Sequence, residues 1–456
     1  MRRVVKVSRI RIIITIIVVV LTTLLTGCTG KEPNEIAYVV ALGIDSTDDD
    51  NYKITIQYAN TTQISGGASE SGGKAGSEIV DNVTIEAPNI YAGVGLANNI
   101  VSKSFSMSHA KLIVFSKEIA EKGVKDMIET LVRSEEIRPD VFIAVANTTA
   151  NDYLTSVNPE MEVNPAQYYQ LIYQKNQLVG IPDGQLREFF TGLYTDNYDS
   201  ILPIAGVIEE SGGNSQNDDK GQSKDSQNEG SEGSSESLDS FESKSSNEKD
   251  ENEKEKDAEK NTSKYEYDIK NYIGGETTIE KKNKAEAIGA AVFEKDKMVG
   301  ELGEVETEIC KMLKGDYTYS YLTYYNNDTP DIPITVKTTQ QKKPKYKIDT
   351  DKKTVDIELY IESDLYSLPA DYNVENKIED FERDVANYTS SACTEFINNF
   401  TKKYNSDILK LNEKVKYKFL TNNQYNWFKK NVGWSEYKFS VCTNFKVRRT
   451  GLIVRE

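Results

Sequence analysis

Residues 36–44, IAYVVALGI, form an uninterrupted apolar run that ends at Asp45. A short run of this kind is typical of a strand that is buried on both faces. After a polar turn at 48–51, residues 52–58 (YKITIQY) alternate between apolar and polar side chains, which predicts a second strand with one buried face. We therefore expect the first sheet to begin at residue 36.

The segments that follow alternate between strand and helix patterns. Residues 117–133 carry apolar side chains at helical spacing and lie between apolar runs at 109–115 and 141–146. Further helices are predicted at 89–101, 165–178 and 184–193, and a further strand at 201–208. Strands that alternate with helices predict a mixed α+β or α/β fold, with mixed sheets packed by helices.

The C-terminal part repeats this mixture and contains the longest predicted helix, 374–404. Its apolar residues recur every three or four positions, which gives one stripe facing a core. Shorter helices are predicted at 304–313 and 422–431, and strands at 287–293, 317–325, 333–339, 354–361 and 436–447. We expect a C-terminal α+β domain with a long amphipathic helix.

Residues 211–264 differ in kind from the rest of the chain. These 54 residues contain 15 acidic side chains, and their hydrophobic residues are only Leu238, Phe241 and Ala258. Such a segment cannot bury enough apolar surface to offset chain entropy, so we predict a disordered insertion. It serves as a solvated spacer or, alternatively, as a charged binding tail.

This insertion sets the predicted domain boundaries of a multi-domain protein. The predicted parts are a signal peptide at 1–27, an N-terminal α/β domain at 28–150, a middle helical and strand region at 151–210, the disordered acidic insertion at 211–264 and the C-terminal α+β domain at 265–456.

The N-terminal 27 residues have the pattern of a secretory signal peptide. A basic start without acidic residues precedes an apolar run at 12–25, and small residues follow. The run is shorter than the roughly 20 residues that span a bilayer. Leu25-Thr26-Gly27-Cys28 resembles a bacterial lipobox, which implies cleavage between Gly27 and Cys28 and lipid attachment at Cys28. An uncleaved membrane anchor is the alternative.

Composition excludes some classes of function. A formal charge of −17 disfavours nucleic-acid binding, which depends on neutralising phosphates. Besides Cys28, the cysteines are Cys310, Cys393 and Cys442, without the spacing of a metal site or redox pair. We interpret them as small buried hydrophobes. A Cys393–Cys442 disulfide is the alternative.

Catalytic and cofactor motifs are scarce. The single histidine, His109, has no obvious cysteine or serine partner, and we assign it a structural role. Residues 92–95, AGVG, contain two glycines of a phosphate loop without the remainder. We predict no catalytic residue, no cofactor and no metal site. A hydrolase that uses scattered carboxylates on the cell wall stays an alternative.

Several stretches, taken in order, resemble the Ger(x)C family, the lipoprotein C subunit of spore germinant receptors. They span nearly the whole chain after Cys28, apart from the acidic insertion. They are Asn34-Glu35-Ile36 with Leu42-Gly43-Ile44-Asp45, His109 to Val114, Glu135 to Arg138, Gly289 to Phe293, Asp296 to Gly300, Glu306-Thr307, Tyr404 to Ile408, and Arg448 to Leu452.

The resemblance implies a three-domain lipoprotein on the outer face of the spore inner membrane. It would act in nutrient sensing with two integral membrane subunits, A and B, and it would have no catalytic centre. A lipid-anchored substrate-binding protein of a transporter is the alternative function, and two similar lobes around a hinge would favour it.

Overall fold

The computed structural model describes residues 13–17, 35–49, 51–59, 80–159, 162, 164–174, 180–195, 197–208, 271–277, 283–325, 333–367 and 377–450. Gly27, Cys28 and the predicted acidic insertion at 211–264 lie outside these residues. Signal cleavage, lipid attachment and disorder of the insertion therefore stay predictions. Within the described ranges, no helix has both the length and the apolarity that crossing a bilayer requires.

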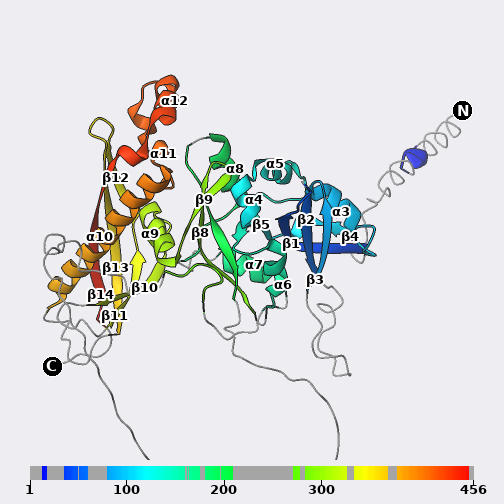
Figure 1. Ribbon diagram of the computed structural model, residues 1–456, viewed down its shortest axis with the longest axis horizontal. Coiled ribbons are helices and arrows are strands. Elements are labelled where there is room, and N and C mark those ends of the chain that lie inside the picture. The colour runs from blue at the N-terminus through cyan, green and yellow to red at the C-terminus, as the bar shows by residue number, and fades with distance from the viewer. Residues whose placement is uncertain are drawn as a thin grey trace, which may run out of the picture. The chain divides into compact units, whose positions relative to one another are not determined.

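The first sheet is built around a parallel centre with antiparallel flanks (Figure 1). The order is β3-β2-β1-β5-β6-β7-β8-β9, and β4 pairs with β1. Neighbours from β1 to β7 are parallel, whereas the pairs at either side are antiparallel. The strands are β1 (Ile36–Ser46), β2 (Tyr52–Ala59), β3 (Val80–Ala87), β4 (Ser104–Ser106), β5 (Leu112–Ser116), β6 (Phe142–Ala146), β7 (Ile201–Val207), β8 (Ala285–Glu294) and β9 (Lys297–Leu302).

Both faces of this sheet are covered. Along β5, Leu112 and Val114 enter one core, and Ile113 and Phe115 enter the other. This alternation explains the continuous apolar runs, because successive side chains of a strand point to opposite faces. One face is covered by α3 (Ile90–Ala97), α4 (Lys117–Lys122), α5 (Lys125–Arg133) and α8 (Leu186–Thr195), and the other by α6 (Ala150–Ser156) and α7 (Pro165–Gln174).

The single helix predicted at 117–133 is wrong, because Gly123 divides it into α4 and α5. Gly123 has φ +122°, and its N–H donates to Ile119 O at 3.0 Å. Val124 N then donates to Asp296 O at 2.9 Å, in the turn between β8 and β9. The break lets α4 and α5 pack separately, and the apolar spacing alone did not reveal it.

The second sheet has the order β10-β11-β13-β12, with β14 parallel to β13. The long helix α10 (Ile378–Tyr404) packs on one face, with α9 (Glu304–Lys314) beside it (Figure 1). The strands are β10 (Tyr319–Tyr325), β11 (Pro333–Gln340), β12 (Lys345–Asp349), β13 (Thr354–Ser367) and β14 (Lys438–Arg449). Between α10 and β14 lie α11 (Leu411–Val415), η4 (Lys416–Lys418), α12 (Asn422–Asn431) and η5 (Trp434–Glu436).

The mixed α+β fold class and the long amphipathic helix of the C-terminal part are confirmed. The sequence analysis missed β3, in which apolar and polar residues are equal in number, the three-residue strand β4, and β12, which has three charged residues out of five. The first sheet also continues across residues 150 and 265, because β7, β8 and β9 join it. The predicted domain boundaries are therefore not edges of this sheet, and the division into domains stays a prediction.

Candidate functional site

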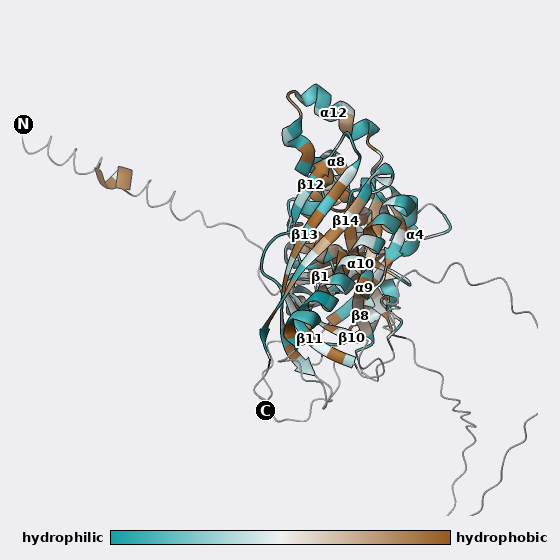
Figure 2. Ribbon diagram, turned by 90° about the vertical axis from the view of Figure 1, so that its left-hand side faces the viewer, coloured by the Kyte–Doolittle hydropathy of each residue, from teal (hydrophilic) through white to brown (hydrophobic). Residues whose placement is uncertain are grey.

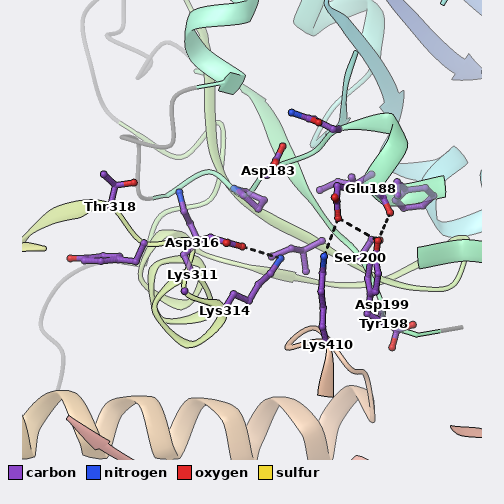
Figure 3. Close-up of a pocket in the computed structure, with 17 residues that line it drawn as sticks. Asp183, Glu188, Tyr198, Asp199, Ser200, Lys311, Lys314, Asp316, Thr318 and Lys410 are labelled. Atoms are coloured by element: carbon purple, nitrogen blue, oxygen red, sulfur yellow. Dashed lines mark hydrogen bonds and ion pairs between the residues drawn. The ribbon is translucent and has the colours of Figure 1, made fainter. Parts of the chain in front are cut away.

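A charged pocket lies where α8 and the start of β7 face the end of α9 (Figure 3). Its volume is about 390 Å³. Three lysines, Lys311, Lys314 and Lys410, line it together with four carboxylates, Asp183, Glu188, Asp199 and Asp316. Its apolar lining includes Phe189, Ile201 and Leu202.

Most of these charges are already paired with one another. Lys410 Nζ lies 3.0 Å from Glu188 Oε2 and 4.3 Å from the centroid of the Tyr198 ring. Tyr198 Oη donates to the backbone oxygen of Glu188 at 2.9 Å. Lys314 Nζ lies 3.8 Å from Asp316 Oδ2, as Figure 3 shows. The pocket is therefore close to neutral within an acidic chain.

Two charged groups that line the pocket have shifted pKa values: Lys311 is buried, and Asp183 is partly buried but keeps exposed surface. Burial lowers the pKa of Lys311 to about 8, although Asp316 and Glu308 oppose the shift. Lys311 Nζ also donates to Ile181 O at 3.0 Å, and this hydrogen bond fixes the position of its amino group. Burial raises the pKa of Asp183, and Lys314 partly opposes this shift. Both pKa values are therefore shifted toward neutral pH from the ordinary values of these side chains.

Two aspartates form a junction next to the pocket. The backbone N of Asp407 donates to Asp199 Oδ2 at 2.9 Å, and Asp199 N donates to Asp407 O at 3.1 Å. The carboxylate of Asp407 accepts from Leu411 N at 2.7 Å and from Asn412 N at 2.8 Å, at the start of α11. Asp407 thus joins the segment before β7 to the segment after α10.

The described lining of the pocket offers charged side chains and the hydroxyl groups of Tyr198, Ser200, Tyr317 and Thr318. Among the described residues that line it there is no histidine or cysteine, so Ser200 has no base of that type in the lining. In the described part of the chain, no cluster of three or more acidic, histidine or cysteine side chains is placed to hold a metal ion.

The residues singled out from the sequence do not gather at this pocket. His109 is exposed, with its ring against Tyr38 at 4.9 Å between centroids and its Nδ1 3.0 Å from Ser108 Oγ. The AGVG stretch lies inside helix α3 and forms no phosphate loop. Cys310, Cys393 and Cys442 are all free thiols, so the Cys393–Cys442 disulfide is not formed.

The sequence analysis also missed the pocket itself. Its lining comes from 182–202, 311–318 and Lys410, which are far apart in the sequence and meet only in the fold. One available signal was Lys311, which lies among apolar residues at the end of the helix predicted at 304–313.

Comparison with known families decides the relationship. The family described as "Spore germination protein N-terminal domain" matches residues 30–207. The family described as "Spore germination B3/ GerAC like, C-terminal" matches residues 288–451. Together the two matches cover about three quarters of the chain, and the N-terminal family precedes the C-terminal family along it. The chain belongs to the GerAC-like family of spore germination proteins.

Individual relatives match over shorter stretches. Spore germination protein KC of Bacillus subtilis (strain 168) is 26% identical over 174 residues, which are 35% of this chain and 42% of that protein. The putative spore germination protein YfkR of the same organism is 28% identical over 145 residues, 32% and 37% of the two chains. This chain thus spans about two fifths of these relatives. The crystal structure of the GerBC protein aligns over 89% of this chain and 96% of its own, with 15% identity and a TM-score of 0.47.

Residues in the stretches that resemble the GerAC-like family make contacts between separate elements of the fold. The carboxylate of Asp45 accepts from Ala150 N at 2.6 Å and from Asn151 N at 3.0 Å, which fixes the start of α6 above β1. Glu136 Oε2 accepts from Met107 N at 2.6 Å. Tyr404 packs so closely on Gly300 that a Cβ at this glycine would overlap the ring.

Proposed function

We propose that this chain is the lipid-anchored C subunit of a nutrient germinant receptor. It is attached through Cys28 to the outer face of the spore inner membrane and acts with two integral membrane subunits, A and B. Its own role is non-catalytic. The acidic insertion at 211–264 is a spacer.

One observation carries the proposal. Both halves of the germination family match, at 30–207 and 288–451, and the acidic insertion falls between them. The N-terminal match begins two residues after Cys28, where a mature lipoprotein would start. The charged pocket is compatible with a non-catalytic role, because its lysines and carboxylates neutralise one another.

The transporter alternative receives less support from the architecture. A binding protein with two similar lobes would have two similar sheets. Here a mixed nine-stranded sheet covered on both faces stands beside a five-stranded sheet of different order. No specific observation favours the wall-hydrolase alternative over the receptor.

Germination of spores that carry Cys28→Ala tests the proposal. We expect a strong loss of the nutrient response and release of the chain from the inner membrane. Cys442→Ala is the matched control, because this exposed cysteine is free and lies on a strand. A normal response with Cys28→Ala would contradict an essential anchor.

Purification of the native complex from the inner membrane tests the partners. Two multi-spanning subunits should accompany the chain. An ATP-driven transporter in their place would favour the binding-protein alternative, and muropeptide release by the purified chain would favour the hydrolase.

A further inference from the structure

The segment 416–431, which we call the lysine–aromatic tip, is positively charged, in contrast to the chain as a whole. Its sequence, KYKFLTNNQYNWFKKN, contains four lysines, five aromatic residues and no acidic residue, although the chain carries a formal charge of −17. It comprises η4, the following loop and α12. Figures 1 and 2 both show α12 projecting past one end of the second sheet.

The inner side of the tip is firmly packed. Tyr425 is buried, and its Oη donates to Asn412 O at 3.1 Å. Phe419 packs on Phe428 at 4.9 Å between ring centroids. Lys429 Nζ donates to Thr195 O at 2.9 Å, which ties α12 to the end of α8. The tip is therefore a fixed platform with defined inner and outer sides.

The outer side exposes large apolar side chains. Leu420 is 94% exposed, Tyr417 is 80% exposed and Trp427 is 68% exposed. Leu420 and Tyr417 are the two most exposed large hydrophobic residues in the described part of the chain. Neither contributes to a core, so the fold does not explain these side chains. Three large apolar side chains exposed within eleven residues favour an interaction surface over a purely structural role.

Exposed lysines accompany these apolar groups. Lys416, Lys418 and Lys430 are exposed, and Lys430 shares a helix face with Trp427 because the two are three residues apart. Glu413 precedes the tip in the sequence, and Asp349 at the end of β12 follows Ile348, whose backbone oxygen accepts from Lys418 Nζ. The outer side of the tip thus combines positive charge with tryptophan, tyrosine and leucine.

We propose that the lysine–aromatic tip docks on an anionic lipid surface. Tryptophan and tyrosine favour the interface between headgroups and acyl chains, and lysines are attracted to anionic headgroups. A projecting tip fits a flat surface better than it fits a pocket of a partner protein. The proposal rests on the membrane location proposed above, and it adds a second contact that would orient the domains relative to the bilayer.

Tryptophan fluorescence tests this docking directly. The chain has two tryptophans, and Trp434 is only 2% exposed, so Trp427 is the one that lipid can reach. The full chain, produced with its own N-terminal signal, is reconstituted into vesicles of phosphatidylcholine, with or without about one third phosphatidylglycerol. We expect blue-shifted emission and quenching by brominated lipid only in the anionic vesicles. Trp427→Phe should abolish both effects, while Trp434 stays unquenched.

A charge variant separates the effect of the tip lysines from the effect of the net charge of the chain. Lys416→Gln with Lys430→Gln should weaken the anionic-lipid signal roughly tenfold or more. Lys446→Gln with Arg448→Gln is the matched control, because it removes the same charge elsewhere in the chain. The two residues lie about 26 Å or more along β14 from Lys438, where the strand begins after the tip. Equal loss in both variants would overturn the proposal.

Two further outcomes would also overturn the docking proposal. The first is identical Trp427 emission in neutral and anionic vesicles. The second is a shift that occurs only when integral receptor subunits are present, because it would assign the tip to a protein partner. Failure of the lipid anchor is distinguishable from both, since the chain would then not float with neutral vesicles at all.

Discussion

The two sheets differ in how many of their faces are covered by helices. In the first sheet, β1, β5 and β6 are buried along almost their whole length, because helices cover both faces. In the second sheet, β13 and β14 alternate: Val355, Ile357 and Leu359 face α10, whereas Asp356 and Glu358 face outward. The apolar pattern of a strand thus reports how many of its faces are covered, and substitutions should follow this difference.

The outward side of the second sheet is a polar ladder. Ser440 Oγ donates to Asp356 Oδ1 at 2.6 Å, and Asn444 Nδ2 donates to Glu358 Oε1 at 3.0 Å. These groups are exposed, so their pairing contributes little to stability. The ladder leaves this face accessible, while the first sheet is reached only through its helices.

The largest expected effect is that of Phe115→Ala in the first sheet. Phe115 has no exposed surface and lies between β5 and its covering helices, so its removal leaves a cavity. We expect a loss of about 3–5 kcal/mol in the free energy of unfolding, measured by urea denaturation. Tyr360→Ala, on the outward side of β13, is the control and should cost about 1 kcal/mol or less. Equal losses would contradict the comparison.

The next effect concerns one buried aspartate beside each sheet. Asp45 and Asp407 each accept two backbone N–H groups at the start of a helix, α6 and α11. Alanine at either position leaves two buried donors without an acceptor, which should cost about 1–3 kcal/mol. Asp→Asn keeps one acceptor and should restore part of the loss. Identical behaviour of alanine and asparagine would argue against the hydrogen bonds as the cause.

How far the sequence predicts this molecule differs between its regions. The strands at 36–44 and 109–115 and the stripe of the long helix were predictable, because burial on a sheet or helix face imposes a local period. The break at Gly123 was not, since the contact that follows it joins Val124 N to Asp296 O, 172 residues later. The charged pocket and the Asp199–Asp407 junction were not predicted either, because they too depend on contacts between distant parts of the sequence.

Protonation of Asp407 gives the third effect. Burial raises its pKa to about 7, and the neighbouring Asp199 adds to this shift. An aspartate in the unfolded chain titrates near about 3.9. Between about pH 4 and pH 7 the folded chain keeps a proton that the unfolded chain has released, so stability falls as the pH rises. Asp407→Asn should flatten this slope by up to about 1.4 kcal/mol per pH unit.

Chemical denaturation at several pH values measures this slope. Glu308, whose pKa burial also raises to about 7, keeps a slope of the same sign in the variant, so the flattening should be partial. The exposed Ser367→Ala variant, which removes no titratable group, is the control and should leave the slope unchanged. An unchanged slope in Asp407→Asn would show that Asp407 is ionised in the folded chain.

The smallest effect on stability should follow modification of Cys442. This thiol lies on the outward side of β14 opposite Glu358, whereas Cys310 and Cys393 are buried among α9 and α10. Burial raises the pKa of Cys310 to about 11 and that of Cys393 to about 12, which further suppresses their thiolates. A neutral reagent such as iodoacetamide should therefore label Cys442 alone in the folded chain and barely change the unfolding midpoint. Labelling of Cys393 at a similar rate, detected by peptide mass spectrometry, would mean that α10 leaves the sheet readily and that the covered face of the second sheet is less protected than its alternating burial indicates.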